Sequence, residues 1–362
     1  MKNISPGSWT NSDNIRRVLK LVIILMPLAL AGNIAYVVLT SNPDLFRDLN
    51  NFHIEFFALA VMLALLPWFG QSVGIIIWSK VFRVNIRSTE ALSAVLASDI
   101  GAAITPTALG GSYAKLAFLI DYGFNPPQAT LVTFLGGLAD ALFFAVALPI
   151  AILWTRTWEN PAVVRIWREF ISHWPVVLII VMVLIVFLIM LKLYRIKRAE
   201  SVPIDGEYNL VSRVYRGIGN FKDEIIIAAR FVLHRGKKAF LACVLFSGIG
   251  WCGRYGAISA LVAGLGYAAD PVLYFLLQWL VFTTMTMVPT PGAIGGAEVS
   301  FAVIYNGLIP PHAIPIATTA WRFVTFYLTV GLASVIFAVS RLGVFPRATR
   351  RAEIVVNEKT KA

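Results

Sequence analysis

Apolar runs that approach or exceed 20 residues recur along this chain, and long polar sequence occurs only at the termini and at 195–238. A helix of about 20 apolar residues crosses the ~30 Å hydrocarbon core of a bilayer. Hydrophobic residues make up 58% of the 362 residues and charged residues 14%, whereas a soluble domain has roughly 45–50% and 25%. The pattern excludes a soluble enzyme and predicts an all-α polytopic membrane protein.

Two interruptions of the apolar pattern, at 105–111 and 290–296, contain proline and paired glycine but no charge. Proline and glycine break helices, and the absence of charge indicates that the breaks lie inside the bilayer rather than in water. The apolar pieces that follow, 112–120 and 297–309, are too short to span comfortably. Each break is therefore either the tip of a re-entrant hairpin or a kink in one crossing helix.

The distribution of basic residues favours the hairpins. With two hairpins and an inside N-terminus, 24 of the 31 Lys and Arg residues fall in cytoplasmic segments and 4 in outer segments, as the positive-inside bias requires. A single crossing at the first break would place the 11 basic residues of 192–238 outside. The net charge of +12 is thus a topological signal rather than a sign of nucleic-acid binding. We expect two re-entrant hairpins, cytoplasmic termini and six full crossings, at 18–39, 54–82, 127–154, 174–194, 239–266 and 313–340.

The two breaks also match each other in sequence, since Thr290 follows Thr105 by 185 positions and the surrounding residues align. Matched pairs are Thr105 with Thr290, Pro106 with Pro291, Ala108 with Ala293, Gly110 with Gly295, Gly111 with Gly296 and, after one gap, Gly123 with Gly307. We expect one transmembrane domain, 1–362, with inverted repeats at 54–154 and 239–340. Broken helices at matching positions of two inverted halves are the plan of secondary transporters, whose site lies near the midplane.

The glycine pairs at the breaks indicate where a ligand would bind. Unwound backbone in a membrane is tolerated only where it is buried in protein or lines a wet cavity. A helix that begins there directs free N–H groups toward an anion such as phosphate; alternatively, the glycines only permit close helix packing. The predicted substrate-binding glycines are Gly110, Gly111, Gly295 and Gly296, and the predicted break residues are Pro106, Pro291 and Gly292.

Six ionisable residues fall within the apolar segments, where a charge is costly and faces a cavity or a partner. The guanidinium groups of Arg254 and Arg322 suit bidentate phosphate binding, and an internal ion pair is the alternative. Lys115 either contacts the ligand or snorkels to the cytoplasmic surface. Glu298 is either a cap or structural ion pair, or a coupling or gating group. The predicted substrate contacts are Arg254, Arg322, Lys115 and Glu298, and the predicted counter-charges or coupling residues are Asp99, Asp140 and Glu298.

Other features argue against catalysis. The four histidines lack metal-ligand spacing, and the sequence contains no nucleophile elbow, P-loop or His-Glu-x-x-His motif. We expect no enzyme activity, no metal site and no cofactor, although an accessory role in a lipid-modifying enzyme complex stays open. An amphipathic pattern at 206–236 predicts a cytoplasmic helix that lies on the inner leaflet or links the two halves.

The hairpin motifs resemble those of the flippase-like family, the transmembrane region shared with lysylphosphatidylglycerol synthases. The resemblance covers about 15–345, and its more specific motif runs from Val288 to Glu298. It implies a role in moving or handling lipids: aminoacylated phosphatidylglycerol in synthase-fused members, and isoprenoid or glycolipid pathways in stand-alone ones. The matching residues are Pro106, Gly110, Lys115, Pro291, Gly295, Gly296, Glu298 and Arg322. The chain departs from the family pattern at Ser112, where Glu is frequent, and at Gly136-Gly137, where a Glu-Arg pair is common.

The leading interpretation is a lipid transporter that moves an anionic phospholipid or isoprenoid-type lipid between leaflets through a midplane site at the two hairpins. The first alternative is a non-transporting subunit that presents a lipid to a lipid-modifying or glycosyl transferase. The second alternative is a small-solute secondary transporter. The expected partners are a membrane lipid with an anionic head group and a lipid-modifying enzyme, not nucleic acid; the sequence indicates no oligomeric state. We expect a stand-alone member without the soluble aminoacyl-transfer domain, in the bacterial inner membrane.

Overall fold

The computed structural model describes residues 52–105, 108–159, 236–286, 288 and 290–341, and isolated residues at 22, 26–27, 30–32, 34–35, 163–164, 168 and 230–231. Pro106 lies outside the described residues. So do the predicted helices at 18–39, 174–194 and 206–236, apart from the isolated residues just given. The chain divides into two units, Met1–Leu148 with Ala239–Ala362, and Pro149–Lys238. The fold and the site described below belong to the first unit.

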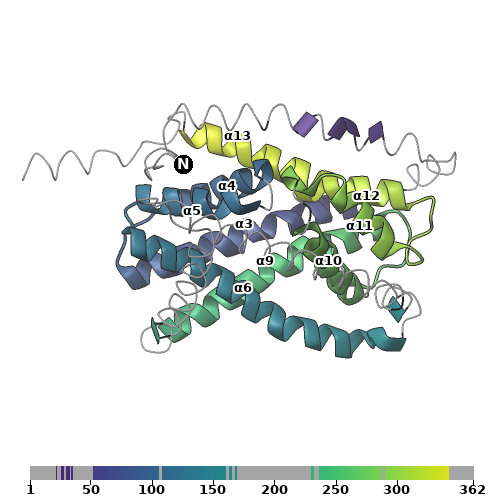
Figure 1. Cartoon of the computed structure of the whole chain (residues 1–362), viewed down its shortest axis with the longest axis horizontal. Coiled ribbons are helices and arrows are strands. Elements are labelled where there is room, and N and C mark those ends of the chain that lie inside the picture. Colours follow the sequence, from purple (N-terminus) through teal and green to yellow (C-terminus); the bar gives the residue numbers. More distant parts are fainter. Residues whose placement is uncertain are drawn as a thin grey trace, which may run out of the picture. The chain divides into compact units, whose positions relative to one another are not determined.

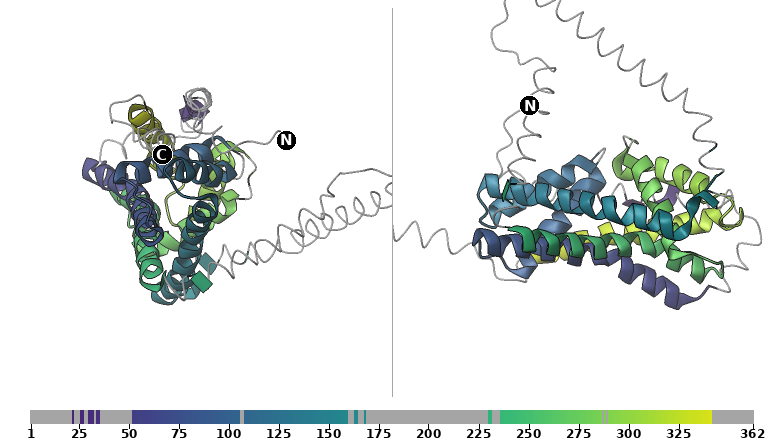
Figure 2. Two further views of the ribbon diagram at one scale, coloured as in Figure 1. Left: turned by 90° about the vertical axis from the view of Figure 1, so that its left-hand side faces the viewer. Right: turned by 90° about the horizontal axis from the view of Figure 1, so that it is seen from below.

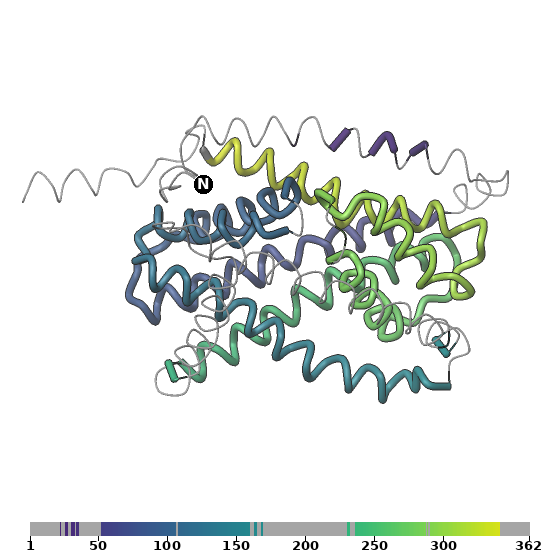
Figure 3. The backbone as a smooth tube through the Cα atoms, in the orientation of Figure 1, coloured from purple at the N-terminus to yellow at the C-terminus, as the bar shows by residue number. Residues whose placement is uncertain are grey.

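The described part of the chain contains two successive series of helices with the same order of lengths: long, short, short, long (Figure 3). The first series is α3 (Ile54–Phe82), α4 (Ser88–Ile104), α5 (Leu109–Asp121) and α6 (Pro126–Thr155). The second is α9 (Lys237–Gly264), α10 (Pro271–Thr286), α11 (Gly296–Tyr305) and α12 (Ile314–Arg322), which continues through the π-helical η6 (Phe323–Leu328) into α13 (Thr329–Arg341). In the second unit, η3 (Thr157–Glu159) follows the end of α6.

Four helical stretches are long and apolar enough to cross a membrane. They are Ile54–Phe82, Pro126–Thr155, Lys237–Gly264 and Ile314–Ser340. Each coincides within a few residues with a crossing expected from the sequence, which confirms apolar helices of membrane-spanning length in the part of the chain that the structure describes. The total of six crossings and the re-entrant placement of the short helices in the bilayer stay predictions.

The helices α4 and α5 fold back on each other and lie side by side in two views (Figures 1 and 2). Their backbones touch at glycine, because a Cβ atom added to Gly101 would lie 2.7 Å from the carbonyl oxygen of Gly110. A Cβ on Gly111 would lie 2.8 Å from the carbonyl oxygen of Ser98. Small residues permit this close approach, so the first glycine pair packs the two helices together.

The two breaks share backbone conformations at the positions that match in sequence. Thr105 has φ −110° and ψ 142°, and Thr290 has φ −109° and ψ 148°. Ala108 and Ala293 both have positive φ, at 57° and 52°, which is uncommon for a residue other than glycine. Later in each series, Gly123 and Gly307 also have positive φ. The two breaks therefore have similar backbone conformations at the matched positions, while the inverted repeat stays a prediction.

The second short pair, α10 and α11, is joined by buried aromatic and amide side chains. The Tyr305 hydroxyl donates a hydrogen bond to Gln278 Oε1 at 3.0 Å, and the Tyr305 ring lies 5.2 Å from that of Tyr274. The break between these helices includes η5 (Pro291–Ala293), which packs against α4 of the first series. The second break therefore meets the first hairpin inside one unit.

Two glycine-to-alanine substitutions test the packing of α4 on α5. Gly101→Ala forces the two backbones apart, and we expect a loss of about 1–3 kcal/mol in unfolding free energy, as for other overpacked contacts. Gly137→Ala on α6 is the matched control, because a Cβ there meets nothing within 4 Å, and helix propensity predicts a gain of up to ~1 kcal/mol. Unfolding of the purified protein in mixed micelles measures both, and equal stabilities would contradict the packing role.

Candidate functional site

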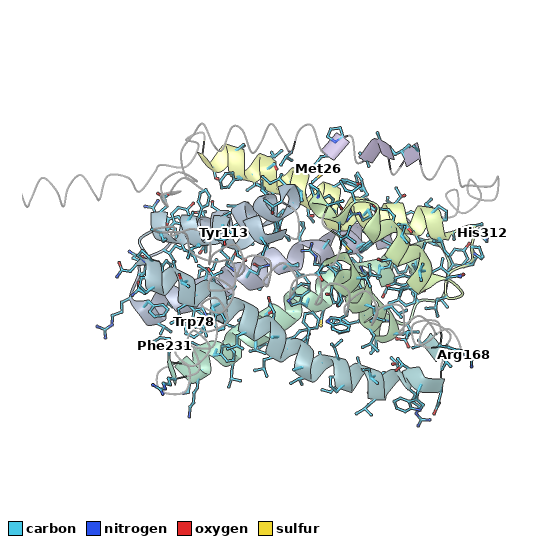
Figure 4. The ribbon with its side chains drawn as sticks, in the orientation of Figure 1. Met26, Trp78, Tyr113, Arg168, Phe231 and His312 are labelled. Carbon is cyan, nitrogen blue, oxygen red and sulfur yellow. The ribbon has the colours of Figure 1, made fainter. Side chains whose placement is uncertain are left out.

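A cavity of about 220 Å³ lies among α3, α4, α5, α6 and α9. Polar side chains from all five helices line it: Gln71, Ser98, Ser112, Lys115, Thr133, Asp140 and Ser247. Trp78 of α3, labelled in Figure 4, contributes an apolar wall and is 1% exposed. Binding pockets for whole ligands usually measure about 300–1,000 Å³, so this cavity suits a head group or a small solute rather than a complete lipid.

The cavity has exposed lining residues on α5 and α6. Ser112 of α5 and Gly137 of α6 both line it and are both exposed. A Cβ added to Gly137 would meet nothing within 4 Å, and one added to Gly136 would meet Lys115 Nζ at 3.8 Å. The absence of side chains at this glycine pair therefore opens the cavity and leaves space in front of the lysine.

The ammonium group of Lys115 lies at the cavity, close to the lining residues Gln71 and Gly136. Its hydrogen bond to Gln71 Oε1 is long, at 3.5 Å. Asp140 and Asp99 are close enough to interact with it electrostatically, yet in the part of the chain that the structure describes no salt bridge joins Lys115 to a carboxylate. The group can therefore bind an incoming anion without first breaking an ion pair.

Asp140 lies across the same cavity on α6 and accepts a hydrogen bond from the Ser247 hydroxyl of α9. An ionised carboxylate has about four acceptor sites, so one hydrogen bond leaves it able to accept others. The cavity thus has one cation and one carboxylate on separate helices.

A second charged group connects α4 with α9 outside the cavity lining. Asp99 Oδ2 accepts a hydrogen bond from Trp68 Nε1 at 2.7 Å and interacts electrostatically with Arg254. The Arg254 guanidinium lies over the ring of Phe282, 5.3 Å from its centroid. Its Nε is buried and has no hydrogen-bond partner among the described residues. Neither charged residue lines the cavity.

The third charged group holds the second break together. Arg322 Nε lies 3.1 Å from Glu298 Oε1, and Arg322 Nη2 donates a hydrogen bond to the Gly292 carbonyl oxygen at 2.9 Å. The other oxygen of Glu298 accepts the Gly295 N–H at 2.8 Å. Arg322 is 1% exposed, and its guanidinium lies 4.5 Å from the centroid of the Phe326 ring. Of the two roles left open for Arg322, the structure shows the internal ion pair.

The second glycine pair and its neighbours also have local roles. Gly292 has φ +62°, and a Cβ there would lie 2.2 Å from the Phe326 ring. A Cβ on Gly296 would lie 2.3 Å from Val288. In the first break, the Gly110 N–H donates to Thr105 Oγ1 at 2.9 Å. The N–H groups that were expected to face an anion at Gly110 and Gly295 are therefore satisfied within the protein.

The structure thus separates the predicted site residues into three groups. Lys115 and Asp140 both line the cavity, Asp99 interacts electrostatically with Arg254, and Glu298 and Arg322 form an ion pair at the second break. Sequence reasoning did not select the other polar residues of the cavity. These are Gln71, Ser98, Ser112, Thr133 and Ser247. These residues could have been found from the sequence as polar side chains inside otherwise apolar helices.

Comparison with known proteins adds a family match over most of the chain. Residues 17–333 match the family described as the lysylphosphatidylglycerol synthase TM region. A UPF0104 membrane protein of Archaeoglobus fulgidus is 25% identical over 288 residues, which cover 75% of this chain and 82% of the relative. No solved structure matches the chain.

The ion pair at the second break predicts a stability defect. Arg322→Gln removes the guanidinium from its ion pair with the mostly buried Glu298 carboxylate, and breaking a buried pair in this way costs about 3–5 kcal/mol. Arg156→Gln is the matched control, because its ion pair with Glu159 is exposed and 3.9 Å long, and such pairs contribute roughly 0–1 kcal/mol. Unfolding in mixed micelles measures both. Wild-type stability in Arg322→Gln would contradict the scaffold role.

Proposed function

Because the chain belongs to the lysylphosphatidylglycerol synthase TM region family, we propose that it is an integral membrane lipid transporter whose cavity holds the phosphate of a lipid head group. The observation that carries this proposal is Lys115, a cation in a polar cavity with no salt bridge among the described residues. A cation at membrane depth is costly unless a partner compensates it. A lipid phosphate is an anion that the membrane itself supplies, at the edge of the hydrocarbon core.

The position of the cavity opening supports a lipid rather than a water-soluble ligand. The exposed rim at Ser112 and Gly137 lies between two helices, and α6 is apolar enough to span the membrane. A head group entering there leaves its acyl chains outside, in the surrounding lipid. The cavity volume of about 220 Å³ is consistent with this division of the ligand.

The repeated architecture supports movement of the lipid as well as binding. Two series of helices with matched breaks, in inverted orientation, would let one half rock against the other around a fixed site. The hairpin α4–α5 carries Lys115 and contacts the second break through α4. Alternate opening of the two sides would then transfer the head group between leaflets. We place both termini in the cytoplasm, since 24 of 31 basic residues then lie there.

Vesicle reconstitution tests this function. A phospholipid labelled on its acyl chain is followed from leaflet to leaflet, and the wild-type chain is expected to accelerate its movement. Lys115→Gln removes one charge-assisted contact, worth about 1.5–3 kcal/mol, and is expected to slow movement by about 10- to 100-fold. The exposed Lys238→Gln is the control and should retain wild-type rates.

A second variant tests the cavity without altering a charge. Gly137→Leu places a large side chain in space that is open in the structure, and it is expected to block lipid movement while the protein remains folded. Gly137→Ala should stay close to wild type. If the wild type binds lipid but never moves it, the chain is instead a subunit that presents lipid to a transferase. If Lys115→Gln and Gly137→Leu both move lipid at the wild-type rate, the cavity is not the site.

A further inference from the structure

The cavity contains two opposite charges that do not neutralise each other by direct contact. Lys115 and Asp140 both line it and interact electrostatically. In the described part of the chain, however, no salt bridge within 4.0 Å joins them. A Cβ atom added to Gly136 would lie 3.8 Å from Lys115 Nζ. Space for a ligand therefore remains beside the two charges.

The charges around this cavity also balance. Lys115 interacts with Asp140 and Asp99, and Asp99 interacts with Arg254. This set contains two cations and two carboxylates. A purely anionic head group would add one negative charge to this balanced set, in the same cavity as the Asp140 carboxylate. An uncompensated buried charge is strongly unfavourable. Binding of a simple anion would leave one such charge in the protein, whereas a ligand that carries its own cation would not.

We propose that the cavity takes a dipolar group, with a phosphate at Lys115 and an ammonium at Asp140, so that the preferred head group has no net charge. This inference rests on the proposed role of the cavity as a head-group site and narrows the ligand from any phosphate-bearing lipid to a zwitterionic one. Asp140 is then a specificity-determining residue. Its hydrogen bond from Ser247 orients the carboxylate and leaves acceptor sites for the ammonium.

Retention of lipid by the purified full chain tests the preference. The protein is incubated with equal amounts of phosphatidylethanolamine, which is zwitterionic, and phosphatidylglycerol, which is anionic, and the bound lipid is measured by native mass spectrometry. Wild type is expected to retain phosphatidylethanolamine about tenfold better, which corresponds to one charge contact of ~1.4 kcal/mol. Asp140→Asn is expected to remove most of this preference and to improve retention of the anionic lipid. The exposed Glu159→Gln is the control and should keep the wild-type ratio.

The outcomes separate this inference from the proposed function. Preference for phosphatidylethanolamine that is lost in Asp140→Asn supports the dipolar site even if vesicle assays show no transport. Retention of phosphatidylglycerol equal to or above that of phosphatidylethanolamine, or an unchanged ratio in Asp140→Asn, overturns it even if lipid is transported. Retention of neither lipid overturns the dipolar site, and the vesicle assay then decides the proposed function.

Addition of free phosphoethanolamine identifies the source of the dipolar group. If the free compound does not displace bound phosphatidylethanolamine, the site recognises the group as part of a lipid. If free phosphoethanolamine displaces the lipid at a concentration similar to that of the lipid, the dipolar site is supported and its ligand is a soluble phosphoamine.

Discussion

Every backbone polar group inside a bilayer must find its hydrogen-bond partner within the protein or a wet cavity, and the two breaks in this chain are where that requirement is hardest to meet. The structure meets it with side chains. Thr105 accepts the Gly110 N–H in the first break, and Glu298 accepts the Gly295 N–H in the second. Arg322 donates to the Gly292 carbonyl oxygen. These side chains, together with the Thr290 hydroxyl, which donates to the Ile294 carbonyl oxygen, satisfy backbone groups of the breaks that lie in the described residues.

This requirement also decides which charges remain available for a ligand. Arg322 is suited to phosphate by its chemistry, yet it is 1% exposed and bonded to both a carboxylate and a carbonyl. Lys115 has a long contact to an amide oxygen and faces a cavity. Arg322 is occupied by its bonds to the backbone and carboxylate of the second break. Lys115 has weaker internal bonds, so we assign ligand contact to Lys115.

Much of the scaffold could be predicted because hydropathy and helix-breaking residues act locally. Four of the expected crossings coincide with long apolar helices, and both breaks fall between short helices. The pairing of charges could not be predicted, because a hydropathy pattern carries no information on which side chains meet. Glu298 and Arg322 are 24 residues apart and meet only because α11 packs on α12. Similarly, the sequence shows Gly136 and Gly137 only as a difference from the family motif. The fold shows that both residues line the cavity.

The location of a bound head group is the measurement that tests this account most directly. Density for the wild-type protein in a lipid nanodisc is predicted to show a lipid phosphate within hydrogen-bond distance of Lys115 Nζ, with the acyl chains leaving between α5 and α6. A phosphate bound at Arg322 or Arg254, with the cavity beside Lys115 holding only water, would contradict it.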